Sequence, residues 1–88
     1  MRLVDAPNTH NSALLTLREM GCELQILPSD DEHEIGLWHA RLDGAEFEAG
    51  DPLALLGLVA LWRHRGDLWK RPDDENLYDA LLEQTYPD

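Results

Sequence analysis

The dipeptide Asp43-Gly44 constrains this chain most, because it stands between two runs of alternating apolar and polar residues. Asp-Gly is a preferred two-residue hairpin turn, since both central positions need a positive φ. If Leu42 pairs with Ala45, one face of the hairpin is entirely apolar. That face consists of Trp38, Ala40, Leu42, Ala45, Phe47 and Ala49. The sequence therefore predicts a β-hairpin with a buried face.

The opposite face of this hairpin supports the same register. It pairs Arg41 with Glu46 and His39 with Glu48, and each is a favourable charge combination. A shift of one residue would send the apolar set to the solvent face and would also break these pairs.

A helix is predicted directly after the hairpin. Asp51 is a good N-cap, Pro52 suits the first helical position, and Gly66 is the expected C-terminal stop. Every residue from 53 to 62 except Gly57 is apolar, so this helix must be covered on more than one side. We expect the sheet to cover one face and the first and last helices to cover the flanks. Alternatively, a second copy or a partner covers part of it.

A first helix and a strand are predicted before the hairpin. Asn8 or Asn11 can cap the helix, and Gly21 supplies a left-handed stop. Its apolar positions, spaced by three and four, are Ala13, Leu14, Leu17 and Met20. The alternation over 22–27 then predicts a strand.

A connector over 67–72 leads to a last helix, whose start is rich in acids at 73–75 and which runs to about Gln84. The predicted fold is α+β in the order α-β-β-β-α-α. We expect a three-stranded antiparallel sheet with the helices packed mainly on one face.

Length and charge limit the function classes. At 88 residues we expect a single small acidic domain, with 18 acidic against 7 basic residues and a net charge of −11. This charge opposes direct binding to nucleic acid or to an anionic membrane and favours a basic protein partner. One cysteine, no apolar run of about 20 residues and no apolar leader predict a cytoplasmic protein.

The acidic segment before the hairpin is the first candidate site. Its carboxylates are those of Asp30, Asp31, Glu32 and Glu34, with His33 among them. Such a cluster could bind a divalent cation or a basic partner. It does not match the calcium-loop pattern, however, and a solvated loop is the simpler interpretation. We therefore predict no metal and no cofactor.

A basic and aromatic stretch after the long helix is the second candidate. Four of the seven basic residues fall in 63–71, close to Trp62 and Trp69. We expect these cations to pair mainly with the chain's own acids. The two tryptophans are candidate anchors for a protein partner.

No pattern of residues points to catalysis. Cys22 begins a strand on its apolar side, where a small core residue is expected. Ser12 and Ser29 stand in capping or loop contexts, and no glycine-rich phosphate loop or nucleophile elbow is present. We therefore expect a protein that is not an enzyme.

The leading hypothesis is a non-catalytic protein-binding or regulatory module of bacterial or phage type. One alternative is a structural subunit that forms a homodimer through the apolar 53–62 helix. Another is an acidic mimic of nucleic acid that inhibits a basic nuclease or defence complex.

Overall fold

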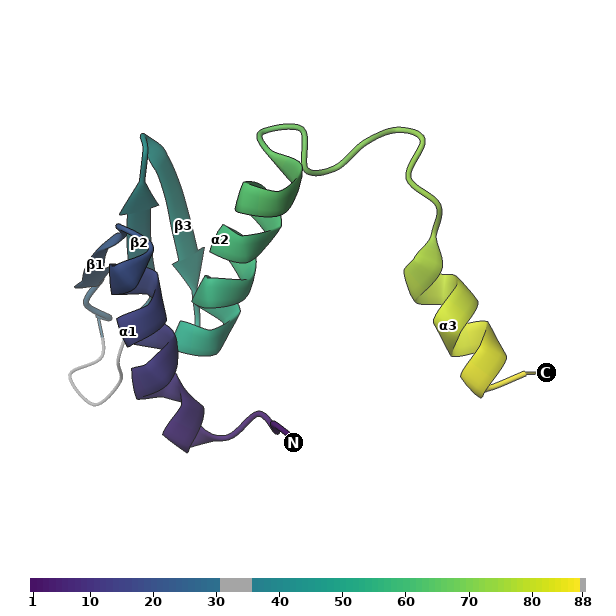
Figure 1. The fold of residues 1–88 in the computed structure, drawn as a ribbon, viewed down its shortest axis with the longest axis horizontal. Coiled ribbons are helices and arrows are strands. Elements are labelled where there is room, and N and C mark those ends of the chain that lie inside the picture. Colours follow the sequence, from purple (N-terminus) through teal and green to yellow (C-terminus); the bar gives the residue numbers. More distant parts are fainter. Residues whose placement is uncertain (31–35, 88) are drawn as a thin grey trace.

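The computed structural model describes residues 1–30 and 36–87 and confirms the α+β class (Figure 1). In chain order the elements are η1 (Pro7–Thr9, a 3-10 turn), α1 (His10–Glu19), β1 (Glu23–Ile26), β2 (Trp38–Leu42), β3 (Ala45–Ala49), α2 (Pro52–Arg65) and α3 (Leu77–Thr85). The strands form one antiparallel sheet in the order β1-β2-β3. The predicted succession of helix, three strands and two helices is confirmed.

The hairpin has the predicted register, with Leu42 opposite Ala45 and Trp38 opposite Ala49. Asp43 and Gly44 have φ values of 50° and 82°, as this turn requires. On the polar face, His39 lies opposite Glu48 in the ladder, but its closest carboxylate is that of Glu46.

The core lies between the sheet and the helices α1 and α2. Leu17 from α1 and Leu55 and Val59 from α2 are fully buried, and they cluster with Ala40 and Leu42 of β2. The Asp51 side chain accepts the Ala54 N–H at 2.8 Å, so α2 begins with the predicted cap.

The start of α1 differs from the prediction. The chain enters α1 through η1, and Thr9 precedes the helix without a side-chain cap. The Thr9 hydroxyl instead donates to the Ala6 carbonyl at 2.7 Å. The prediction that Asn8 or Asn11 caps this helix was therefore wrong. Gly21, at φ 99°, provides the predicted left-handed stop.

The last helix departs most from expectation. α3 stands apart from the other elements (Figure 1) and does not cover a flank of α2. It begins after Asn76, whose side chain accepts the Asp79 N–H at 3.0 Å, so Asp73–Glu75 precede the helix. The radius of gyration is 15.9 Å, against about 12 Å for a compact domain of this length. Of the described helices, α1 packs on β1, and α2 packs on β2 and β3.

Candidate protein-binding surface

An apolar groove runs between β3 and α2, and we call it the β3–α2 groove. Its volume is about 460 Å³. The lining residues are Ala45, Glu46, Phe47, Glu48, Leu58, Leu61, Trp62, Asp67 and Trp69. The groove therefore brings together both tryptophans singled out from the sequence.

Trp62 forms a fixed wall of this groove. Its ring contacts Phe47 edge-on, with centroids 5.7 Å apart and planes inclined by 62°. The indole N–H donates to the Asp67 carboxylate at 2.7 Å. Because its polar atom already has a partner within the chain, Trp62 offers a partner mainly its ring surface.

Trp69 is the more accessible anchor. It follows the end of α2 and is 49% exposed, and Leu58 and Leu61 on the outer side of α2 are also exposed. These three side chains give the groove apolar surface that the fold does not bury. Such surface beside a fixed aromatic wall resembles the centre of many protein interfaces.

The rim of the groove is acidic. Among the described residues that line it, the charged ones are Glu46, Glu48 and Asp67. Glu46 Oε1 lies 3.6 Å from the Arg41 guanidinium and 3.5 Å from His39 Nε2, on the polar face of the sheet. Glu48 lies on the same face of β3, opposite His39, and the Asp67 carboxylate accepts the Trp62 N–H, so these acids stand at the border of the groove. Negative charge at that border favours a cationic partner.

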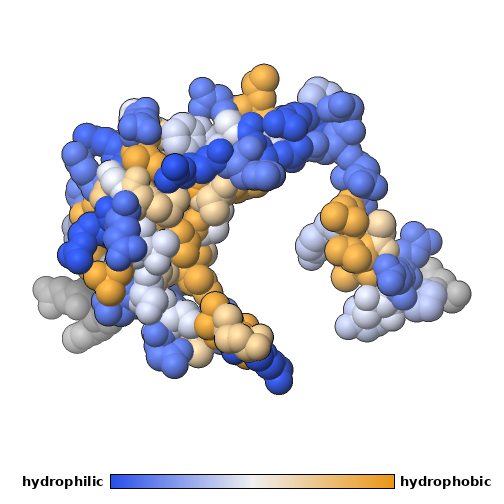
Figure 2. Space-filling model, in the orientation of Figure 1, coloured by the Kyte–Doolittle hydropathy of each residue, from blue (hydrophilic) through white to orange (hydrophobic). Residues whose placement is uncertain are grey.

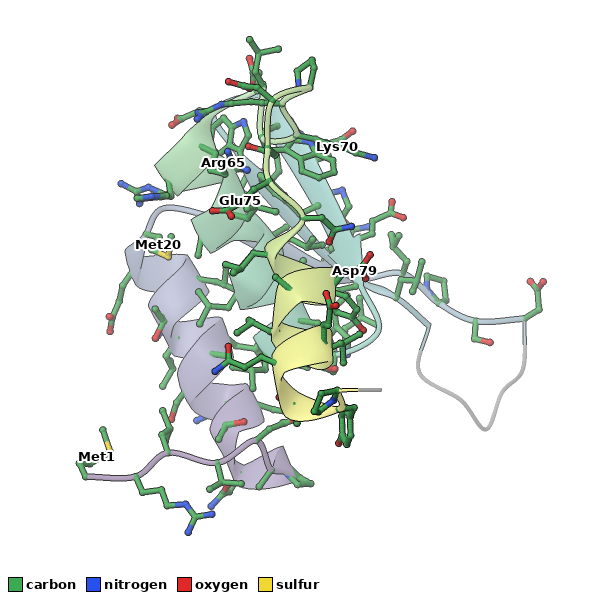
Figure 3. The ribbon with its side chains drawn as sticks, turned by 90° about the vertical axis from the view of Figure 1, so that its right-hand side faces the viewer. Met1, Met20, Arg65, Lys70, Glu75 and Asp79 are labelled. Carbon is green, nitrogen blue, oxygen red and sulfur yellow. The ribbon has the colours of Figure 1, made fainter. Side chains whose placement is uncertain are left out.

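The chain after α2 is held by a cluster of hydrogen bonds. The Arg65 guanidinium donates twice to the Asp74 carboxylate, at 2.9 and 2.6 Å, and the Arg71 N–H donates to it at 3.0 Å. The Arg71 guanidinium also donates to the Arg65 carbonyl, at 3.2 Å. Figure 3 shows Arg65 near the part of the linker (residues 66–76) that carries Lys70 and Glu75. The expectation that this basic stretch pairs with the chain's own acids is confirmed for Arg65.

This cluster gives a pH-dependent prediction. The Arg65 hydrogen bonds, followed by the Arg71 N–H, lower the pKa of Asp74 from 3.8 to about 2. Because the folded pKa is depressed, the stabilisation is fully present above the ordinary value and is lost as the pH falls through about 2. In an NMR titration, the Asp74 carboxyl carbon is expected to change shift with a midpoint near 2.

The matched variants are Asp74→Asn and Asp73→Asn, which remove the same charge from neighbouring positions. Only Asp74→Asn is expected to speed amide exchange in the linker, because Asp74 accepts the hydrogen bonds that hold it. Equal exchange in both variants would contradict this role.

The structure describes only the first residue of the acidic segment, Asp30. Asp30 is exposed and is not among the lining residues, and Asp31, Glu32, His33 and Glu34 lie outside the described residues. Within residues 1–30 and 36–87, no three histidine, cysteine or acidic side chains are placed to hold a metal ion.

Cys22 is a core residue. It is buried beside Leu17 and Leu42, and burial raises the pKa of its thiol. The thiolate is the nucleophilic form of cysteine, so a thiol kept protonated reacts poorly.

The comparisons add no relative to this description. No family model matches the chain, and the searches of curated proteins and of solved structures return no match. In the part of the chain that the structure describes, every helix is too short or too polar to cross a membrane.

Sequence reasoning did not assign the large apolar lining residues Phe47, Leu58 and Leu61 to a binding surface. It assigned Phe47 to the core and treated Leu58 and Leu61 as parts of a helix covered on several sides. The spacing of Leu58 and Leu61 by three on a helix with no polar face was the available signal.

Proposed function

We propose that this chain is a non-catalytic protein-binding or regulatory module whose β3–α2 groove takes an apolar segment with basic flanks. The observation that supports this most strongly is the combination in one groove of exposed Trp69, Leu58 and Leu61 with an acidic rim. Apolar contacts would supply affinity, and the rim would select for positive charge.

The fixed wall supports the same function. Trp62 is already oriented by Phe47 and Asp67, so little side-chain freedom is lost when a partner contacts it. Trp69 would close over the bound segment from the linker side. Trp62 would thus give a partner an oriented ring, and Trp69 an exposed one, and both suit reversible binding.

An acidic mimic of nucleic acid is less well supported. Such a mimic presents rows of carboxylates free to meet cations of the target. Here the Asp74 carboxylate is already bound by Arg65 within the chain. The groove is therefore the better candidate for the binding determinant.

The proposal predicts a large effect of Trp69→Ala on partner binding and a small effect of Leu68→Ala. Leu68 is adjacent and exposed but does not line the groove. Loss of an interface tryptophan typically costs 2 kcal/mol or more, or about 30-fold in Kd.

The measurement is a calorimetric titration with a designed amphipathic peptide that has leucines on one face and lysines on the other. Equal affinity of the two variants and the wild type would reject the groove as the binding site. Since Trp69 is half exposed, its removal is expected to leave the unfolding midpoint nearly unchanged.

A further inference from the structure

α3 carries an apolar stripe that is exposed and that no other described element covers. Its large apolar residues, all exposed, are Leu77, Tyr78, Leu81 and Leu82, and Tyr86 follows the helix on the same exposed segment. A helix of nine residues is marginal in water unless its apolar face is packed. Something must therefore cover this face when α3 is stably formed.

A second groove of the same chain is also open. The α1–α2 groove lies between the N-terminal segment, α1 and the first half of α2, and its volume is about 700 Å³. Its apolar lining residues are Leu3, Val4, Ala6, Ala13, Leu53 and Leu56. Figure 2 shows apolar surface on the N-terminal segment and on α3, on opposite sides of a wide hollow.

Charge distinguishes the two grooves as sites for α3. The helix contains Asp79 and Glu83 and no basic residue. Within residues 1–30 and 36–87, the one charged residue lining the α1–α2 groove is Arg2, whereas the charged residues lining the β3–α2 groove are all acids. An acidic amphipathic helix therefore matches the α1–α2 groove and is repelled by the β3–α2 groove.

The linker favours a second copy as the source of the helix. The Asp74 carboxylate accepts two hydrogen bonds from Arg65 at the end of α2. Two residues, Glu75 and Asn76, separate Asp74 from α3. With these bonds in place α3 stands off its own body. A second copy can contact both α3 and the α1–α2 groove while the hydrogen bonds between Arg65 and Asp74 stay intact.

We propose that two copies of this chain exchange α3 reciprocally, each helix packing into the α1–α2 groove of the other copy. The arrangement is a closed twofold dimer, in which the same pair of surfaces is used twice. It goes beyond self-association through α2 alone, because α2 supplies only Leu53 and Leu56 to the floor. It also leaves the β3–α2 groove open and does not depend on the function proposed for it.

The test combines sedimentation with cysteine cross-linking. Wild-type protein is expected to sediment as a dimer. Two single-cysteine chains, Ser12→Cys and Leu81→Cys, both carrying Cys22→Ala, are expected to form a cross-linked dimer when mixed and oxidised. A strict monomer at high concentration would overturn the proposal. So would a chain with both new cysteines that cross-links only within itself.

Point variants locate the interface. Leu81→Asp is expected to weaken the dimer by about 10- to 100-fold, since a buried leucine contact is lost. The fold should be unaffected, because α3 does not pack on its own body. Leu68→Asp is the control, since Leu68 is exposed and lines neither groove. A dimer that withstands Leu81→Asp would place the interface elsewhere and overturn the proposal.

Salt separates this interface from the other groove. Two copies with a net charge of −11 each repel one another, so added salt is expected to strengthen the dimer. Binding of a basic peptide in the β3–α2 groove should weaken with salt. A dimer that added salt does not strengthen would count against the exchange of α3. Peptide binding that added salt does not weaken would count against the β3–α2 groove, so each proposal can fail without the other.

Discussion

Replacing Leu55 by alanine is expected to lower the free energy of unfolding by about 2–5 kcal/mol. Leu55 is fully buried where α2 meets Leu17 and the sheet. Truncation removes apolar contacts and leaves a cavity that the surrounding strands and helix can fill only in part. Urea unfolding followed by circular dichroism measures the change.

Leu58→Ala is the matched control on the same helix. Leu58 is 39% exposed, so its truncation is expected to cost less than about 1 kcal/mol. Equal losses for the two variants would contradict the placement of the α2 core face. A selective loss in Leu55→Ala would support the assignment of Leu58 to an open groove.

Replacing Gly36 by alanine is expected to destabilise the fold by about 1–3 kcal/mol or more, as overpacking does. A Cβ at Gly36 would clash with the Leu27 carbonyl oxygen and would lie 2.8 Å from the Pro28 carbonyl carbon. Backbone cannot rotate away as a side chain can. The Leu27 N–H also donates to the Leu37 carbonyl at 2.7 Å, which holds the two segments together.

Gly50→Ala is the control for this prediction. A Cβ at Gly50 meets nothing within 4 Å, and its φ is not in the left-handed region. The same change is therefore expected to be neutral or slightly stabilising. If Gly36→Ala also left the urea midpoint unchanged, this result would contradict the close packing of Gly36 against the Leu27 backbone.

The hairpin and α2 could be predicted because their determinants are local. Asp43-Gly44 sets the turn, alternation sets the faces, and Asp51 caps the helix within three residues of itself. The cap of α1 was mispredicted because η1 precedes the helix, and the Thr9 hydroxyl bonds back to Ala6.

The position of α3 could not be predicted because it depends on a contact between Arg65 and Asp74, which are nine residues apart in the sequence. Its amphipathic pattern is consistent with packing on its own core, on a second copy or on a partner. The hydrogen bonds from Arg65 to Asp74 hold the linker that leads to α3, and nothing in the local pattern selects Asp74 over its neighbours.

The candidate groove was predicted in part. Trp62 and Trp69 were recognised as aromatic residues flanking a basic stretch, and the structure places both in one groove. The acidic rim comes partly from β3, whose acids were read as ladder partners of Arg41 and His39. The packing of β3 against α2 makes residues of β3 line the same groove as Trp69.

The most direct test of the groove is its selectivity for charge. Calorimetry would compare two peptides with the same leucine face, one with lysines and one with glutamates on the polar face. The acidic rim predicts binding of the lysine peptide alone, weakening as salt is added and lost in Trp69→Ala. Equal binding of both peptides, or binding unchanged in Trp69→Ala, would contradict a role for this groove in partner recognition.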